Sequence, residues 1–291
     1  MNSPELPKPR PLVIVVATIA ALLAFAANSL LCREALGKQL IDATSFTMIR
    51  LVAGTIMLGV ISAVIHRSDD RWRRAGNWLS GIALFVYAWA FSLAYRSLTA
   101  ETGALVLFGC VQVTILTWGI IRGERLSRWQ WLGFIMAMAG LLYLVSPGLS
   151  APPLGGAVCM AIAGSAWGVY SVRGRGHKQP VAANAGNFAI AMCLALIVSL
   201  LDPGSLRISE PRGVLLAVIS GAITSGLGYA IWYTALTGLT ATRAAIVQLM
   251  VPIITALAAV MFLGGSLSLR LITAGLLILG GVALVVLERR K

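Results

Sequence analysis

The sequence predicts an all-α integral membrane protein whose ten transmembrane helices form two inverted five-helix repeats. Three observations support this fold class. The chain of 291 residues is 58% hydrophobic and 11% charged, whereas about 25% of the residues in soluble domains are charged. Its apolar runs are long enough to cross a bilayer. A segment of the first half also recurs in the second half.

Ten apolar runs follow one another along the chain, each with about the 20 residues that a helix needs to cross the hydrocarbon. Clusters rich in Pro, Gly, Ser and Asp, such as "SPGLSAPP" at 146–153 and "DPGS" at 202–205, end some of them, because these residues favour turns. Lys and Arg residues end others. In order, the predicted helices occupy 12–32, 44–66, 76–96, 100–121, 127–145, 153–172, 181–200, 212–235, 242–264 and 268–287.

The Lys and Arg residues between the runs predict the orientation, because short basic loops tend to stay in the cytoplasm. With the N-terminus in the cytoplasm, sixteen of them lie in inner segments and six in outer segments, while Arg50 lies within the second run. We therefore expect a cytoplasmic N-terminal tail at 1–11 and a cytoplasmic C-terminus at 289–291. The outer six are Arg33, Lys38, Arg96, Arg207, Arg212 and Arg270.

The repeat is clearest between Leu98–Val145 and Leu239–Val286, which align without a gap at an offset of 141 residues. The aligned segments share "LTA", "LS", a Thr at 114 and 255, and a Gly at 140 and 281. Each half then holds five helices, an odd number, so the second half enters the membrane from the opposite side. We expect one repeat at 12–146 and the other at 152–288. Inverted repeats are typical of secondary transporters that bind substrate between the halves.

Several functional classes lack their usual residues in this sequence. The net charge of +13 comes from residues between apolar runs, so we expect a lipid bilayer and no nucleic acid as a partner. The four cysteines are scattered, and the two histidines lie in charged loops, which predicts no metal site and no enzyme active site. No Gly-x-x-x-x-Gly-Lys motif is present, so we expect no nucleotide-driven pump and no cofactor.

The candidate binding residues are neutral polar and aromatic side chains deep within the predicted helices. Aromatic groups near mid-helix can line an apolar cavity, and amides can orient a ligand inside it. Alternatively, each of these side chains packs or bonds to a neighbouring helix. A carboxylate deep in a span would be typical of proton coupling; none is evident, although an interfacial Glu remains an alternative. The candidates are Asn28, Tyr87, Trp89, Gln112, Trp167, Tyr229, Trp232 and Gln248.

Arg50 is the one charge deep within a predicted helix. Its first possible role is structural, either pairing with Glu34, Asp42 or Glu101 or extending toward the outer interface. Its second possible role is contact with the carboxylate of a substrate.

Gln248 and Pro252 interrupt the apolar run at 242–264. Proline cannot donate a hydrogen bond to the carbonyl four residues earlier, which belongs to Gln248. A free carbonyl is tolerated in a membrane only where protein or a water-filled cavity satisfies it. We therefore expect Pro252 to form a hinge beside a cavity, with Ala245, Gln248, Pro252, Thr255 and Ala259 on one inward face.

Several motifs point to one family. They are Asn28 with Arg33 and Arg50, "GERLSRWQWLGFIMAMAG" at 123–140, "AWG" at 166–168, "GLGYAIWYTAL" at 226–236 and "TATRAAIVQLMVP" ending at Pro252. In these residues the chain resembles the ten-helix EamA-type transporters of the drug/metabolite transporter superfamily. Among them it is most similar to bacterial inner-membrane amino-acid exporters.

The resemblance implies export of amino acids, including uncharged and aromatic ones, or of related small metabolites across the bacterial inner membrane. Transport would proceed by alternating access around a central cavity, without a required oligomer. Carriers for nucleotide sugars or cationic drugs are the alternative within transport. A non-transport membrane protein is the alternative outside it.

Overall fold

The computed structural model describes residues 11–65, 75–123, 126–146, 148, 151–174, 179–201, 206–239, 244 and 247–287. The backbone of these residues is almost entirely helical, and their β-type pairing is an isolated bridge between Ile41 and Ile208. The predicted C-terminal tail and all but the last residue of the N-terminal tail lie outside the described residues, as do most of the basic residues predicted for the inner loops.

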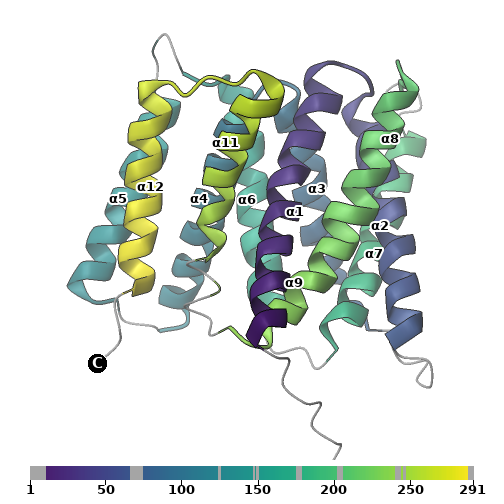
Figure 1. Ribbon diagram of the computed structural model, residues 1–291, viewed down its shortest axis with the longest axis horizontal. Helices are drawn as coiled ribbons and strands as arrows, with labels where there is room; N and C mark the ends of the chain where they lie inside the picture. Colours follow the sequence, from purple (N-terminus) through teal and green to yellow (C-terminus); the bar gives the residue numbers. More distant parts are fainter. Residues whose placement is uncertain are drawn as a thin grey trace, which may run out of the picture.

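The helices follow one another as an antiparallel series (Figure 1). The first half contains α1 (Pro11–Gly37), α2 (Ala43–Ile65), α3 (Trp78–Tyr95), α4 (Ala100–Ile121) and α5 (Arg128–Val145). The second half contains α6 (Leu154–Gly174), α7 (Pro180–Leu201), α8 (Pro211–Ile219), the π-helix η3 (Ser220–Leu227), α9 (Gly228–Leu236), α11 (Met250–Leu263) and α12 (Leu269–Leu287).

The helix lengths agree with the predicted membrane spans. Within the described residues, nine helical stretches are long and apolar enough to cross a membrane, and α8, η3 and α9 together form one of them, Pro211–Leu236. The remaining predicted span, 242–264, contains the shorter apolar helix α11 of 14 residues. The protein is therefore a multi-pass membrane protein.

Polar side chains at the helix starts explain where several helices begin. Asn77 before α3 and Thr99 before α4 each accept a hydrogen bond from the backbone N–H three residues later. Ser127 and Gln130 form a capping box at the start of α5. These caps satisfy N–H groups that have no partner within the helix.

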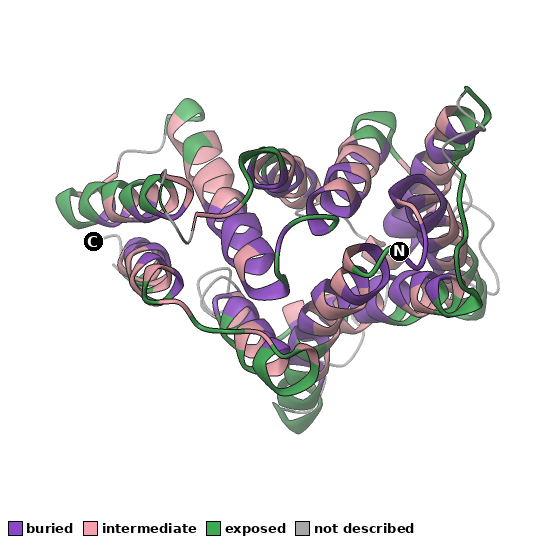
Figure 2. Ribbon diagram, turned by 90° about the horizontal axis from the view of Figure 1, so that it is seen from above, coloured by how far each residue is buried: buried purple, intermediate pink, exposed green. Residues whose placement is uncertain are grey.

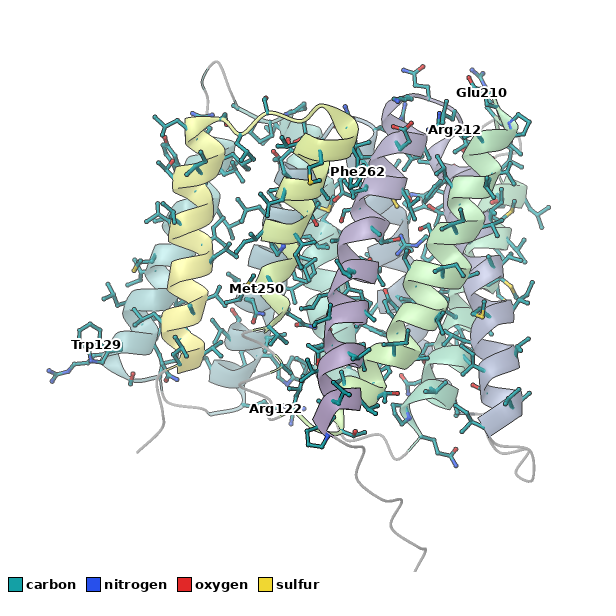
Figure 3. All side chains as sticks on the ribbon, in the orientation of Figure 1. Arg122, Trp129, Glu210, Arg212, Met250 and Phe262 are labelled. Atoms are coloured by element: carbon teal, nitrogen blue, oxygen red, sulfur yellow. The ribbon has the colours of Figure 1, made fainter. Side chains whose placement is uncertain are left out.

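The start of α1 and the end of α12 lie on one face of the helical layer (Figure 1). Figure 3 places Arg122 and Trp129 toward this face, which we call the terminal face, and Glu210 and Arg212 toward the opposite face. The predicted inner residue Arg122 and the predicted outer residue Arg212 thus lie on opposite sides. The cytoplasmic assignment of the terminal face stays a prediction.

The contacts between helices repeat when the two halves are exchanged. Helix α5 packs against α12 and α2 against α7, while the contacts of α6 with α3 and α4 correspond to those of α1 with η3, α9 and α11. A Cβ atom on Gly140 would lie 3.1 Å from the carbonyl oxygen of Ala274, and one on Gly281 would lie 2.4 Å from that of Gly133. At the repeat offset of 141 residues, Gly140 corresponds to Gly281 and Gly133 corresponds to Ala274. The two contacts are therefore equivalent in the two halves. The predicted fold class of ten helices in two inverted repeats is confirmed.

Large apolar side chains cover the outside of the helical layer. Ile56, Val60 and Val64 on α2 are 61%, 57% and 59% exposed and recur every four residues, the spacing of one helix face. Seen from above, buried residues gather where helices meet, and exposed residues lie on the outward faces (Figure 2). The outward faces are thus suited to lipid.

Candidate functional site

A small cavity lies where the two halves meet. Its volume of about 20 Å³ has room for about one water molecule. Side chains from α1, α3, α4, α6, η3 and α9, together with Gln248, form its wall. The lining residues are Phe25, Asn28, Ser29, Tyr87, Phe91, Leu107, Phe108, Trp167, Thr224, Tyr229 and Gln248.

Aromatic rings from both halves form much of this wall. The ring centroid of Trp167 on α6 lies 4.8 Å from that of Tyr87 on α3. In a second pair, Phe25 on α1 lies 5.9 Å from Tyr229 on α9. The rings of Trp167 and Tyr229, 5.0 Å apart, join these two pairs. Each pair therefore joins one residue of the first half to one residue of the second half, and the pairs meet at the cavity.

Asn28 is held by the π-helix η3. Its Oδ1 atom accepts hydrogen bonds from the hydroxyls of Ser220 at 2.7 Å and Thr224 at 3.1 Å. A π-helix contains a wider turn than an α-helix and often occurs at functional sites. Ser220 and Thr224 of η3 are four residues apart, so they lie on one side of the helix and reach the same amide oxygen. The π-helix thus fixes one polar side of the cavity.

The neighbouring η3 residue Ser225 contacts Arg50. Its hydroxyl lies 3.3 Å from Nε and 3.2 Å from Nη2 of the guanidinium, which donates to it. Nη2 also donates to the hydroxyl of Tyr87 at 3.2 Å. A Cβ atom on Gly221 would lie 2.1 Å from the carbonyl oxygen of Arg50, so a glycine there allows η3 to approach α2 closely.

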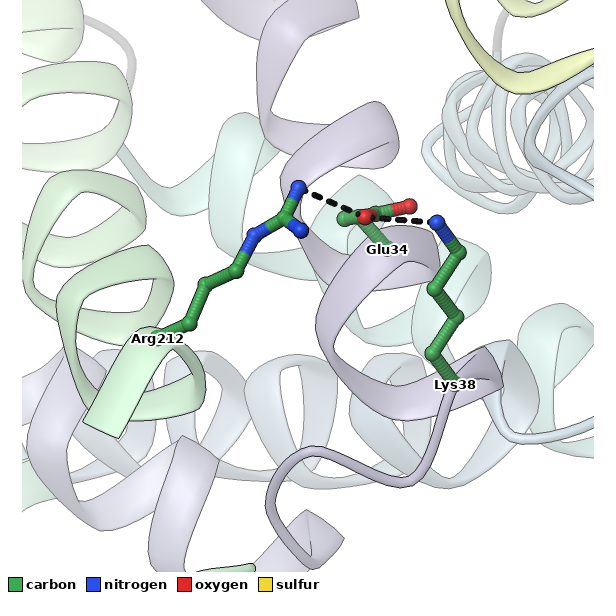
Figure 4. Close-up of polar contacts among 3 residues, drawn as sticks. All are labelled: Glu34, Lys38 and Arg212. Atoms are coloured by element: carbon green, nitrogen blue, oxygen red, sulfur yellow. Dashed lines mark hydrogen bonds and ion pairs between the residues drawn. The ribbon is translucent and has the colours of Figure 1, made fainter. Parts of the chain in front are cut away.

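An ion pair with Glu34, Asp42 or Glu101 was one possible role of Arg50 in the sequence-based prediction. This ion pair is not formed. Within the described residues, no carboxylate pairs with this guanidinium, which is 1% exposed and does not reach the interface. Glu34 pairs with Lys38 at 2.8 Å and Arg212 at 2.9 Å (Figure 4). Asp42 accepts hydrogen bonds from the backbone N–H groups of Ser45 and Arg207. These carboxylates are held at the opposite face, away from Arg50.

The structure brings five of the eight candidate residues together on the cavity, namely Asn28, Tyr87, Trp167, Tyr229 and Gln248. Trp89 is half-buried against Phe85 at 5.6 Å between ring centroids. It lies two residues beyond Tyr87 and therefore points to another side of the helix.

The other two candidates also lie outside the cavity wall. Trp232 is buried and lies 5.8 Å from Phe25, in a cluster with the small residues Ala17 and Ala21. Gln112 is 4% exposed, and its Nε2 atom has no hydrogen-bond partner in the described structure. The alternative of packing between helices thus fits Trp232, whereas the ring contact of Trp89 is with Phe85 of its own helix.

Several lining residues were not predicted from the sequence. Phe25 and Ser29 lie three residues before and one residue after Asn28, and Phe91 lies one turn beyond Tyr87. Helical spacing from the chosen residues was the signal that could have identified Phe25 and Phe91, whereas Ser29 is adjacent to Asn28 and had no such signal. Thr224 had no such signal, because its position depends on the π-turn.

The helix around Pro252 is interrupted beside the cavity. Leu249 forms a turn, α11 begins at Met250, and Pro252 lies in the first helical turn, where a missing N–H is tolerated. Of the predicted inward face, Pro252, Thr255 and Ala259 are buried and Gln248 lines the cavity. Ala245 lies outside the residues whose side chains are described. The hinge role of Pro252 stays a prediction.

Comparison with known proteins identifies relatives over nearly the whole chain. The model of the EamA-like transporter family matches twice, at residues 12–146 and 154–287. The uncharacterized protein PA1977 of Pseudomonas aeruginosa is 52% identical over 272 residues, which cover 94% of each chain.

More distant relatives are named as transporters. An uncharacterized transporter of Archaeoglobus fulgidus is 28% identical over 73% of this chain and 75% of its own length. The uncharacterized transporter YwfM of Bacillus subtilis is 24% identical over 81% of each chain. A crystal structure with 21% identity has a TM-score of 0.65 and covers 94% of this chain and 96% of its own. Because its identity is low, that structure supports the fold alone.

Proposed function

The chain belongs to the EamA-like transporter family, and we propose that it exports amino acids or related small metabolites from the bacterial cytoplasm across the inner membrane. The observation that carries this proposal is the cavity between the two halves, whose wall consists of aromatic, apolar and neutral polar side chains. Such a wall suits a small solute with an uncharged or aromatic side chain. Substrate would bind there and be released by alternating access.

Contacts between the halves on both sides of the cavity support transport by movement of one half against the other. At the opposite face, Glu34 of the first half pairs with Arg212 of the second half. At the terminal face, Arg173 of the second half donates to the side chains of Asn77 and Ser80 of the first half at 3.0 and 3.3 Å. The halves are joined on both sides of a cavity that holds about one water molecule. Substrate would enter only after one set of contacts separates.

The lining side chains can recognise the parts of an amino acid other than its carboxylate. The faces of Trp167 and Tyr229 attract an ammonium group through cation–π interactions and also pack against an apolar side chain. Gln248 and Ser29 can form hydrogen bonds with the ligand. Among the described residues of the wall, none is acidic or basic, so we expect transport that does not depend on a proton gradient.

Counterflow in proteoliposomes tests the proposed function. Vesicles containing the purified protein are loaded with an unlabelled amino acid, and uptake of labelled Phe, Leu, Thr and Lys is compared with uptake by protein-free vesicles. We expect exchange of uncharged and aromatic amino acids at rates that an imposed pH gradient does not change. Exchange of none of them, with uptake of a nucleotide sugar or a cationic dye instead, would assign the protein to the alternative classes of carrier.

A further inference from the structure

Arg50 has a buried positive charge beside the cavity and no carboxylate partner in the described residues. We propose that Arg50, together with Ser225 and Tyr87, forms a site for the carboxylate group of the transported solute. This inference rests on the proposed function, because it identifies the part of the substrate that the cavity wall does not recognise. The substrate class then becomes small carboxylates and zwitterions.

The guanidinium retains donors after its contacts with the protein are made. It has five N–H groups, of which Nε and Nη2 donate to Ser225 and Tyr87. Nη1 is buried and has no hydrogen-bond partner in the described structure. A carboxylate is planar and can accept two parallel hydrogen bonds from a guanidinium. The free N–H groups of Nη1 therefore match this group in charge, and a shift of Tyr87 would free Nη2 for the second of the two parallel hydrogen bonds.

A structural role alone leaves the charge of Arg50 incompletely compensated. Its neighbours are two hydroxyls and the rings of Tyr87 and Phe91, whose centroids lie 5.4 and 5.2 Å from Cζ. Such contacts reduce the cost of burying a cation but provide no counter-charge. Charged residues within membrane spans generally pair with another charge or mark a substrate pathway. An anionic group of the substrate would supply the missing charge.

Tyr87 and Phe91 connect this charge with the cavity. Both side chains line the cavity and also contact the guanidinium. Ser225 follows Thr224, which also lines the cavity. When the halves separate, a shift of the Tyr87 ring would expose the donors of Arg50 to a ligand. One guanidinium among neutral residues suits a monoanion, whereas a phosphate dianion would leave one charge unmatched.

Ligand-dependent thermal unfolding of the purified protein in detergent tests the site directly. The probes are phenylacetate and phenylacetamide, which have nearly the same shape and differ in charge. A ligand that binds the folded state raises Tm according to its concentration relative to Kd. We expect phenylacetate to bind on the order of 10- to 100-fold more tightly than the amide, as for hydrogen bonds to charged groups. The variant Arg50→Met should lose this preference, and Arg50→Lys should keep part of it.

Two further variants keep the test decisive. Ser62→Ala removes a buried hydroxyl from the same helix, about three turns from Arg50, and should preserve the preference. Ser225→Ala keeps the charge and removes one partner, so it should reduce the preference even if Arg50→Met does not fold. Equal binding of acid and amide by the unmodified protein, or a preference unchanged in both Arg50→Met and Ser225→Ala, would overturn the site.

The outcome is distinguishable from that of the counterflow experiment. Exchange of amino acids without an acid preference would leave the proposed function in place and refute the carboxylate site. A preference for phenylacetate that depends on Arg50, without exchange of any amino acid, would support the site and refute amino-acid transport.

Discussion

The Nη2 atom of Arg50 donates a hydrogen bond to the hydroxyl of Tyr87 at 3.2 Å, which links a buried charge on α2 to the wall of the cavity. Tyr87 also lies 4.8 Å from Trp167, whose ring contacts Tyr229 and so joins the two aromatic pairs. One tyrosine therefore contacts both the charge and the aromatic wall. The cavity and its surroundings form one connected site, in which removal of single groups has specific consequences.

Removal of the Tyr87 hydroxyl should impair transport more than stability. In Tyr87→Phe the ring still packs against Trp167, but the guanidinium loses one of its two polar partners. We expect the rate of phenylalanine counterflow to fall by roughly 10-fold, while Tm changes little. The control is Tyr143→Phe on α5, where the side chain is 43% exposed. Equal rates in the two variants would show that the hydroxyl has no role in transport.

Removal of the Asn28 amide should destabilise the protein. In Asn28→Leu, the hydroxyl of Ser220 loses its acceptor at 2.7 Å, and a buried polar group without a partner costs about 1–3 kcal/mol. We expect a lower Tm in detergent. Thr55→Val is the control, because Thr55 bonds only to the carbonyl of Leu51 in its own helix among its described contacts. A Tm unchanged in Asn28→Leu would mean that η3 does not depend on this amide.

The ion pair between Glu34 and Arg212 should help close the opposite face. It joins α1 to α8 at 2.9 Å, beside backbone hydrogen bonds from Ser209 and Glu210 to Leu40. We expect Glu34→Gln to increase the rate at which an impermeant thiol reagent modifies a cysteine introduced at Ser29, in a chain whose native cysteines are replaced by Ala.

Exchange of the two charges provides the control for this closure. The double variant Glu34→Arg with Arg212→Glu should restore slow modification, because the attraction between the side chains is regained. Lys38→Gln should have a smaller effect, since Lys38 follows α1 directly and pairs with Glu34 within the same half. Rapid modification in the double variant would indicate that the backbone contacts, and not the ion pair, control access.

Loss of the break near Pro252 should slow transport without unfolding the protein. Alanine at this position can donate a backbone hydrogen bond to Gln248 and extend α11 toward its N-terminus. We expect Pro252→Ala to maintain Tm and to lower the counterflow rate. Pro211→Ala is a matched control, because Pro211 lies at the start of α8, where proline needs no donor. Equal counterflow rates in both variants would exclude a hinge.

Much of the fold was predictable because the membrane imposes strong constraints on the sequence. Apolar runs must be helical and long enough to span, and the repeat relates Gly140 to Gly281, which occupy corresponding places in the packing of α5 against α12. The aromatic and amide residues Tyr87, Trp167 and Gln248 were predictable for the cavity, because polar groups at depth stand out in apolar helices.

The remainder of the site depends on features that a helical pattern does not contain. In the π-helix η3, Ser220 and Thr224 contact Asn28 and Ser225 contacts Arg50, and no residue type in this segment specifies the wider turn of a π-helix. The missing counter-charge of Arg50 was also not predictable. Glu34 lies close to Arg50 in the sequence and was a reasonable partner for its charge. It pairs instead with Arg212, which is 178 residues away from Glu34.

The most direct test of substrate binding in the cavity is phenylalanine counterflow by Trp167→Ala compared with Trp129→Ala. Trp167 joins the aromatic wall of the cavity, whereas Trp129 is 59% exposed at the start of α5. When both are reconstituted at equal density, Trp167→Ala should exchange phenylalanine roughly 10-fold more slowly than the unmodified protein, or more slowly still. This is the effect expected for loss of a large buried aromatic contact. Trp129→Ala should match the unmodified protein. Equal exchange by the two variants would contradict a substrate site in this cavity.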